Sequence, residues 1–318
     1  MNQKTNKDQP HYIGVDVCKD KLDVFCRRWS RPRVFANNLA GIRSLLKELS
    51  KTNQNIHVVC EATGGYEKQL LSLAFESDVA ISRVNPRQVR DFARAKGQLA
   101  KTDEIDARIL CEYGEVFALA PTKALSPTQN ELSAVIRRRH HLVSQLVGEK
   151  TALQKATDKF VRKDLKAAIA FLQRHIASCD QQIKALISSD EVMSQKQRRM
   201  AQIKGVGPGV CSLILGELPE LGSISDKQAA ALVGLAPMNR DSGKWRGTRT
   251  IHGGRALVRR GLYMPALCAA KHNTILSEIY QRLRAANKPH HVALTAVMRK
   301  MICLLNRILG DPQFVPSS

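Results

Sequence analysis

Two short apolar segments near the start of the chain each have a carboxylate at or next to their C-terminal end, and this feature constrains the fold most strongly. Residues 11–17 (HYIGVDV) and 56–60 (IHVVC) are rich in β-branched and aromatic side chains, as buried strands are. Asp16 is the last residue but one of the first segment, and Glu61 directly follows the second. Carboxylates at strand ends meet only when their strands are neighbours in one sheet. The order of strands and helices therefore decides what these two residues can do.

Strand and helix patterns alternate over the first 120 residues. Strands are expected at 11–17, 22–26, 33–36, 56–60 and 79–84. A helix capped by Asn38 follows the third strand, a second runs to about residue 75, and Pro86 and Thr102 open two more. Three meandering strands, then helix, strand, helix, strand and helix, is the order of a ribonuclease-H-like fold. We therefore predict an α/β domain of this kind over residues 1–124.

The remainder of the chain has a helical pattern. Between residues 128 and 204 there is no proline and only one glycine, Gly148, and apolar residues recur at near-heptad steps from Leu132 to Phe160. This pattern predicts a helical hairpin or coiled coil over 125–200, serving as a spacer and dimerisation arm. Residues 201–318 are rich in glycine and basic residues and end in a helical tail, which predicts a mostly helical third domain.

The segment GVGPGV at 205–210 lies between two apolar helical stretches. This arrangement is typical of a helix-hairpin-helix, in which glycines let backbone N–H groups approach a phosphate at a helix N-terminus. Gly205, Gly207 and Gly209 are therefore candidate nucleic-acid contacts. A plain turn between two helices is the alternative.

The charge balance indicates a polyanionic partner. The chain has 318 residues with 50 Lys+Arg against 28 Asp+Glu, a formal net charge of +22, and 43% of its residues are hydrophobic, which excludes a largely disordered chain. Nucleic acid is the leading candidate. No apolar run approaches the roughly 20 residues that a bilayer span needs, and the first ten residues lack a signal-peptide core. Eight scattered cysteines without a CxxC pair indicate reduced thiols and a cytoplasmic protein without membrane contact.

Two further carboxylates lie close together in the sequence. Asp103 and Asp106 are three residues apart after Thr102, so they share one face of the expected helix. In a ribonuclease-H-like sheet this helix packs across the strands that carry Asp16 and Glu61, and four carboxylates would converge. Such a cluster makes sense with hard divalent cations, Mg²⁺ or Mn²⁺, which can clamp the oxygens of a phosphodiester. The alternative is that each acid is a surface residue or a helix-start charge.

Ser242 lies in a strongly basic stretch and is a candidate nucleophile. Guanidinium and ammonium groups can neutralise the charge that builds up when a hydroxyl attacks a DNA phosphate. The candidate nucleic-acid-binding residues around this serine are Lys244, Arg246, Arg249, Arg255 and Arg259. A serine in a flexible phosphate-binding loop is the alternative, and spacing alone favours that alternative.

Seven segments in order resemble the IS110 family of insertion-sequence transposases and its pilin-gene-invertase relatives. They are IGVDVCKDKLDV, EATGGYE, NPRQVRDFARAKGQLAKTDEIDA, IKGVGPGV, GLAP, SGKWRG and IHGGRALVRRGLYMPAL. The resemblance implies a RuvC-like domain whose DEDD tetrad falls on Asp16, Glu61, Asp103 and Asp106, and a transposase domain whose catalytic serine is Ser242. One departure is Cys18, where a small residue such as serine is expected.

The resemblance also implies a reaction and partners. Family members recombine double-stranded DNA, target and donor, through a covalent phosphoserine link, with Mg²⁺ at the acidic site and the two sites meeting across subunits. Insertion-sequence members use a guide (bridge) RNA that pairs with both DNAs. A homodimer or tetramer is expected because two duplexes are cut together.

Three other functions remain open from the sequence. A site-specific invertase of the same architecture is the closest, and only the DNA that flanks the gene would separate it from a transposase. A RuvC-like junction-resolving nuclease would use the acidic site alone, with water as the nucleophile. A basic nucleic-acid-binding protein with a decayed site is the non-enzymatic alternative, and the intact tetrad argues against it.

Overall fold

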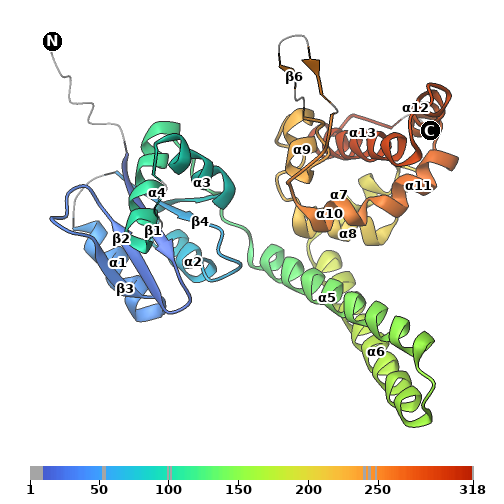
Figure 1. The fold of residues 1–318 in the computed structure, drawn as a ribbon, viewed down its shortest axis with the longest axis horizontal. Helices are drawn as coiled ribbons and strands as arrows, with labels where there is room; N and C mark the ends of the chain where they lie inside the picture. The colour runs from blue at the N-terminus through green and yellow to red at the C-terminus, as the bar shows by residue number, and fades with distance from the viewer. Residues whose placement is uncertain are drawn as a thin grey trace. The chain divides into compact units, whose positions relative to one another are not determined.

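The computed structural model describes residues 10–51, 55–98, 100, 102–238, 241–242, 245–247 and 249–316, with only the backbone described at 241–242 and 245–246. The chain divides into two units, residues 1–124 and 125–318. Figure 1 shows the helices and strands of each unit. The further division of the second unit at residue 200 remains a prediction.

The described part of the first unit is a five-stranded mixed sheet with helices on both faces. Its strands are β1 (His11–Val17), β2 (Lys21–Phe25), β3 (Arg33–Ala36), β4 (Ile56–Glu61) and β5 (Ala80–Val84), and its helices are α1 (Leu39–Ser50), α2 (Lys68–Glu76), α3 (Pro86–Ala95) and α4 (Asp103–Phe117). The spatial order is β3-β2-β1-β4-β5. The strands β1, β2 and β3 pair antiparallel, whereas β4 and β5 run parallel to β1. The expected order of elements is confirmed, with ends shifted by one residue at most in the strands.

Side-chain alternation along the strands separates two cores. Ile13, Val15 and Val17 pack with α1 and α2 on one face of the sheet, whereas Tyr12 and Val59 pack with α3 and α4 on the other. Successive residues of a strand point to opposite faces, so the even-numbered positions of β1 all lie on the α4 side. This alternation determines on which face the polar residues of these strands lie.

Side-chain caps begin the helices at the predicted residues. Asn38 accepts a hydrogen bond from the amide of Gly41 at the start of α1, and Thr102 accepts one from Ile105 at the start of α4. A cap of this kind satisfies one of the amides that the first turn leaves without a partner, and its loss costs about 1 kcal/mol. The cap at Thr102 determines where α4 begins, and Asp103 and Asp106 therefore lie in the first turn.

The second unit is helical apart from one short hairpin in its described part. Its helices are α5 (Pro127–Lys155), α6 (Lys159–Ser189), α7 (Glu191–Met200), α8 (Pro208–Glu217), α9 (Asp226–Val233), α10 (Ala256–Gly261), α11 (Tyr263–His272), α12 (Thr274–Ala285) and α13 (His290–Gly310), and its hairpin strands are β6 (Asp241–Ser242) and β7 (Trp245–Arg246). Among the described residues, no helix is long and apolar enough to cross a bilayer.

Helices α5 and α6 form an antiparallel hairpin (Figure 1). Arg139 of α5 pairs with Asp180 of α6, with 2.5 Å between Nε and Oδ1, and Arg162 closes the turn by donating to the carbonyl of Ala156. Leu132 is buried, as the predicted stripe requires, but Phe160 is 78% exposed. The chain turns at 156–158, so Phe160 lies in the first turn of the returning helix α6. Coiled-coil packing of this arm remains a prediction.

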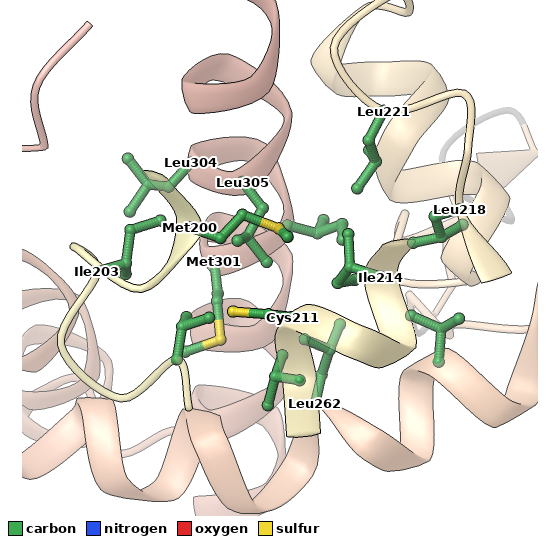
Figure 2. Packing of buried hydrophobic residues seen from close by; sticks show 14 of the residues in the cluster. Met200, Ile203, Cys211, Ile214, Leu218, Leu221, Leu262, Met301, Leu304 and Leu305 are labelled. Atoms are coloured by element: carbon green, nitrogen blue, oxygen red, sulfur yellow. The ribbon is translucent and has the colours of Figure 1, made fainter. Parts of the chain in front are cut away.

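One core holds the rest of the second unit together. Figure 2 shows apolar side chains from α8, α13 and the segments beside them pointing toward one another. The labelled members are Met200, Ile203, Cys211, Ile214, Leu218, Leu221, Leu262, Met301, Leu304 and Leu305. Burial of each large side chain of this kind contributes roughly 1.5–3 kcal/mol, so this core gives the short helices α8–α11 a stable platform.

Candidate active site

Three acidic residues of the first unit lie on the face of the sheet that α4 covers. On β1, Asp16 occupies the same face as the core residue Tyr12, because the two are separated by an even number of positions. On β4, Glu61 shares a face with the core residue Val59 for the same reason. Asp16 is also directly opposite Asp23 of β2 in the antiparallel register. In the parallel register of β1 and β4, Val15 pairs with Cys60. The next residues along the two strands, Asp16 and Glu61, therefore lie at the same edge of the sheet. The topology thus places all three acids at one end of the α4 face.

Helix α4 adds two more carboxylates from above the sheet. Asp103 and Asp106 lie in its first turn, after the cap at Thr102. Acidic residues are favourable in the first turn, where the helix dipole is positive. The dipole therefore offsets part of the repulsion that these residues experience from the acids of the strands.

The five acids meet around Asp16. Burial is the largest cause that raises the pKa of Asp16 from its ordinary value of 3.8 to about 6, and the charges of Glu61, Asp106, Asp103 and Asp23 raise it further. Ligand atoms of Asp16, Cys18, Asp23 and Asp103 lie within 4.8 Å of one another. The structure thus brings together the carboxylates that the sequence singled out, at a site where their negative charges interact strongly.

Two members of this cluster, Asp23 and Cys18, were not among the residues singled out from the sequence. Asp23 is 7% exposed and lies between the buried residues Leu22 and Val24 on β2. An acid at the alternate position of a buried strand was a signal in the sequence, because it shows that one face of the strand is polar. Cys18 lies in the β1–β2 turn and was noted only as a departure from the family.

The ammonium of Lys21 neutralises part of this negative charge. Its Nζ lies 2.7 Å from Oδ2 of Asp103 and 3.0 Å from Oδ2 of Asp23, and it donates to Oδ1 of Asp23 at 3.3 Å. These hydrogen bonds raise the pKa of Lys21. Since Lys21 is half-exposed, its ammonium can leave without disturbing the core.

The donor set fits a divalent cation. Oδ2 of Asp23 is buried and lies 3.0 Å from Nζ of Lys21, so this acid is already paired with a positive charge, as a buried carboxylate must be. Carboxylate oxygens are the ligands that Mg²⁺ and Mn²⁺ prefer. Asp16, Glu61, Asp103 and Asp106 would hold such an ion, which would supply a polarising positive charge there.

The loop that follows Glu61 is held by a buried carboxylate. Oε2 of Glu67 accepts hydrogen bonds from the amide of Gly65 at 2.8 Å and from the amide and hydroxyl of Thr63 at 3.2 and 3.1 Å. Burial is the largest single effect and raises the pKa of Glu67, but the hydrogen bonds to its carboxylate together outweigh burial and lower the pKa. Asn37 ties the same loop to the β1–β2 turn by donating to the carbonyls of Tyr66 and Cys18. The chain on both sides of the cluster is therefore fixed.

Gly14 determines how closely α4 approaches the sheet. A Cβ at this position would lie 1.8 Å from the carbonyl oxygen of Ala107 and 2.6 Å from the amide nitrogen of Cys111, both in the backbone of α4. A backbone cannot move aside as a flexible side chain can. Only glycine thus allows α4 to bring its first-turn acids to Asp16.

We expect Gly14→Ala to destabilise the first unit by roughly 1–3 kcal/mol or more, because the added methyl group must push α4 off the sheet. The measurement is urea unfolding followed by Trp29 fluorescence in a Trp245→Phe background, which leaves one tryptophan, in the first unit. Gly148→Ala is the control: nothing lies within 4 Å of a Cβ there, and because Gly148 belongs to the second unit, the midpoint reported by Trp29 should not change. An unchanged midpoint in Gly14→Ala would contradict this account of the packing.

The stability of the first unit should depend on pH through Asp16. Because folding raises its pKa from 3.8 to about 6, the contribution of this group is fully present below 3.8 and is lost as the pH rises through 6. Without metal, Asp16→Asn should therefore stabilise the unit by about 2 to 3 kcal/mol near pH 8 and by little near pH 4. Unfolding followed by Trp29 fluorescence in EDTA measures this. Asp20→Asn, at an exposed turn position, should show no such trend, and a gain that does not depend on pH would refute the assignment.

The second unit presents Ser242 on a small hairpin. Ser242 pairs with Trp245 and Asp241 with Arg246 in the two-stranded ladder of β6 and β7. Below it, the amide of Met238 donates to the carbonyl of Thr250 at 2.9 Å. Lys244 lies outside the described residues, and so do the side chains of Ser242 and Arg246. Which groups surround the serine hydroxyl therefore remains a prediction.

Close backbone contact fixes the base of this hairpin. Gly234 ends α9 with φ +72°, and a Cβ there would lie 2.1 Å from the carbonyl oxygen of Gly253. Gly254, with φ +66°, would place a Cβ 2.2 Å from the amide nitrogen of Gly234. The guanidinium of Arg259 then donates to the carbonyls of Val233 at 3.1 Å and Gly253 at 2.5 Å. Gly234 of the GLAP segment therefore contacts Gly253 and Gly254 of the GGR segment, and this contact forms the base of the hairpin.

The candidate basic residues of this unit differ in what they contact. Arg255 forms an ion pair with Glu220, with 2.5 Å between Nη2 and Oε1, and donates to the carbonyl of Glu217. Arg259 is bonded to carbonyls as described, whereas Arg249 is exposed. The intramolecular bonds of Arg255 and Arg259 were not expected from the sequence. Nucleic-acid binding by these three residues stays a prediction.

The GVGPGV segment forms the turn before α8 and the first residues of that helix. Pro208 occupies the first turn of α8. Gly205 has φ +98°, and a Cβ there would lie 2.8 Å from Cβ of Ala269 in α11, so this glycine is required for packing. Nothing lies within 4 Å of a Cβ added at Gly207 or Gly209. Gly209 is exposed and Gly207 is half-buried, and phosphate contact at this turn remains a prediction.

Comparison with known protein families shows which family contains both the acidic cluster and the segment around Ser242. A model of the DEDD transposase domain of IS110 matches residues 13–161, and one described as transposase IS116/IS110/IS902 family matches residues 197–281. The chain belongs to the IS110 family of transposases. The first match contains the acidic cluster, and the second contains Ser242. This transposase is thus an enzyme of DNA recombination, and it acts on DNA.

Two curated relatives match nearly the whole transposase. The pilin gene-inverting proteins of Moraxella bovis and Moraxella lacunata are each 27% identical over 303 residues, which covers 92% of this chain and 94% of each relative. The similarity therefore includes both units and the arm between the two family matches.

Proposed function

We propose that this transposase cuts and rejoins DNA through a covalent bond between Ser242 and a DNA phosphate, with Mg²⁺ or Mn²⁺ at the acidic tetrad. The convergence of Glu61, Asp103 and Asp106 on the buried Asp16 carries the proposal. Buried carboxylates that repel one another are costly to maintain, and phosphoryl-transfer chemistry explains why a basic protein would keep them.

We assign the first unit to the RuvC-like class, as a proposal. The support is the strand order β3-β2-β1-β4-β5 with β1 to β3 antiparallel and β4 and β5 parallel. A helix that crosses the central strands and carries acids in its first turn adds to this support. A bound cation would supply charge neutralisation near the scissile phosphate.

The chain itself would provide the remaining chemistry. Ser242 would attack the phosphorus, and the hairpin base at Gly234, Gly254 and Arg259 would hold it in place. The basic residues near it, Lys244, Arg246 and Arg249, would stabilise the charge that develops on the phosphate oxygens. Arg249 is exposed and therefore accessible to a polyanion.

Partners of this enzyme follow from the same proposal. Target and donor DNA are the substrates, and a guide RNA from the element would select them; the net charge of +22 supports binding of both polyanions. A dimer or tetramer would allow two duplexes to be cut together. The arm over 125–200 leaves Val147, Phe160 and Phe171 exposed, which supports contact with a second copy through this arm.

Site-specific DNA inversion is the second candidate. It is favoured by one observation, the 27% identity to two pilin gene-inverting proteins over 92% of this chain. Inversion would use the same residues and differ only in how the two DNA sites are arranged. The DNA that flanks the gene distinguishes the two functions.

The test is to express the protein with its native flanking DNA, so that any guide RNA and substrate are present. A denaturing gel should show a protein–DNA adduct that requires Mg²⁺ and disappears with EDTA. Sequencing of the joined products then separates transposition from inversion. Strand cleavage without any adduct would refute the serine mechanism and indicate a metal-dependent nuclease.

A further inference from the structure

The β2–β3 loop, strand β3 and helix α1 of the first unit carry a large excess of positive charge. Residues 26–51 contain seven basic residues and one acidic residue, Glu48. The basic residues are Arg27, Arg28, Arg31, Arg33, Arg43, Lys47 and Lys51, and all seven are exposed. We propose that this surface, which we call the basic face, binds the phosphate backbone of double-stranded DNA without regard to its base sequence.

The loop and the helix form one surface. Arg33 of β3 donates to Oε1 of Glu48 on α1 at 2.8 Å, and Lys51 at the end of α1 donates to Oε2 of the same glutamate at 2.8 Å. Arg31, Arg33, Ser44 and Glu48 also line one open hollow of about 550 Å³. The cations of the loop, the strand and the helix are therefore accessible to the same bound molecule.

Helix α1 presents its cations in a row. Its buried residues are Ile42, Leu45, Leu46 and Leu49. Arg43, Lys47 and Lys51 follow one another at steps of four residues on the exposed side, so each lies about 6 Å further along the helix axis than the last. Among the ion pairs of the described residues, Lys51 pairs with Glu48, and none includes Arg43 or Lys47. The row therefore offers positive charge to a polyanion.

The loop that continues the basic face is held in place by its own arginines. Arg27 donates to both carboxylate oxygens of Glu115 on α4, at 2.6 and 2.7 Å. The guanidinium of Arg33 lies 4.3 Å from the centre of the Trp29 ring. Arg28 and Arg31 lie between these two fixed points and are exposed. Cations on a fixed loop lose little conformational entropy when they bind, which favours binding.

The basic face is separate from the acidic cluster. Helix α1 packs on the side of the sheet that carries Ile13 and Val15, whereas the cluster around Asp16 lies on the side covered by α4. The seven cations therefore do not serve to neutralise the catalytic acids. Lysine and arginine contacts to phosphates provide affinity and position a duplex without reading its sequence. Since this enzyme acts on DNA, duplex DNA is the polyanion that fits, and the proposal requires neither Ser242 nor a divalent cation.

The experiment measures the affinity of the full chain for a random-sequence DNA duplex by gel shift over a range of salt concentrations. EDTA is present, so that no cleavage interferes. A variant that combines Arg43→Gln, Lys47→Gln and Lys51→Gln should bind about tenfold or more weakly. Its plot of log affinity against log salt should be less steep by about 2 to 3, because each lost phosphate contact removes about 0.9 from the slope.

The matched control removes the same charge from the arm by combining Lys150→Gln, Lys163→Gln and Lys166→Gln, which are exposed positions of α5 and α6. It should keep the wild-type slope. A second measurement follows Trp29 in the Trp245→Phe background: duplex DNA should change its fluorescence in a saturable way, and Arg28→Gln with Arg31→Gln should weaken that response.

Three results would overturn the proposal. They are a wild-type slope in the α1 variant when circular dichroism shows that it is folded, an equal loss of slope in the arm variant, and a loss of affinity that affects a structured RNA but not the DNA duplex. None of these results bears on the serine mechanism, since that is judged by the covalent DNA adduct.

Discussion

Asp16→Asn should lower the rate of DNA cleavage by at least about a hundredfold, the loss typical when one preorganised charged group is removed from an active site. Asp16 is the buried acid around which Glu61, Asp103 and Asp106 gather. Asparagine has nearly the same shape, so packing on β1 is retained while the negative charge is lost. A divalent cation would then lose its central ligand.

The measurement is single-turnover cleavage of the flanking DNA at saturating Mg²⁺, with DNA binding measured separately by gel shift at the same salt concentration. Glu104→Gln is the matched control, because Glu104 lies between Asp103 and Asp106 in sequence but is exposed. It should cleave at nearly the wild-type rate. Asp16→Asn should still bind DNA, since the basic surface is unchanged. If a folded Asp16→Asn protein cleaved DNA at the wild-type rate, the acidic-site mechanism would be refuted.

Ser242→Ala should abolish the covalent protein–DNA adduct altogether. Without the hydroxyl there is no oxygen at this position to form the ester with phosphorus. The hairpin that carries Ser242 is defined by backbone pairing with Trp245 and by the glycine contacts below it. Alanine is compatible with that backbone, so the fold and DNA binding should persist.

Adduct formation on a denaturing gel checks this expectation, with Ser223→Ala as the control for an exposed serine of the same unit. The informative comparison is with strand cleavage. If Ser242→Ala loses the adduct and also fails to cut, serine is the nucleophile. If it cuts as well as wild type, then water is the nucleophile, and the enzyme acts as a RuvC-like nuclease through its acidic site alone.

The elements of the first unit were predictable because their signals are local. Asn38 and Thr102 cap helices at the expected positions, and the β-branched run 56–60 forms β4. Period-two alternation then determines which face each residue of a strand occupies. A local pattern of this kind needs no partner elsewhere in the chain to be recognised.

The membership of the acidic cluster was only partly predictable. Asp16, Glu61, Asp103 and Asp106 were marked by strand ends and by a helix start. Asp23 depends on the antiparallel register that sets it opposite Asp16, which follows from pairing between two segments. Phe160 shows the same limit, because its position on an apolar stripe did not reveal where the helical hairpin turns.

The sequence by itself determined the strand and helix order, the basic charge, the four spaced carboxylates and the motifs that identify the family. The tertiary structure alone decided that α4 approaches β1 closely enough for its acids to reach Asp16, through the missing side chain of Gly14. It also decided that Arg255 and Arg259 are bonded within the chain, and that Cys18 and Asp23 join the cluster. The physical reason is that close approach, register and charge interaction are properties of pairs of distant segments, which a local pattern does not contain.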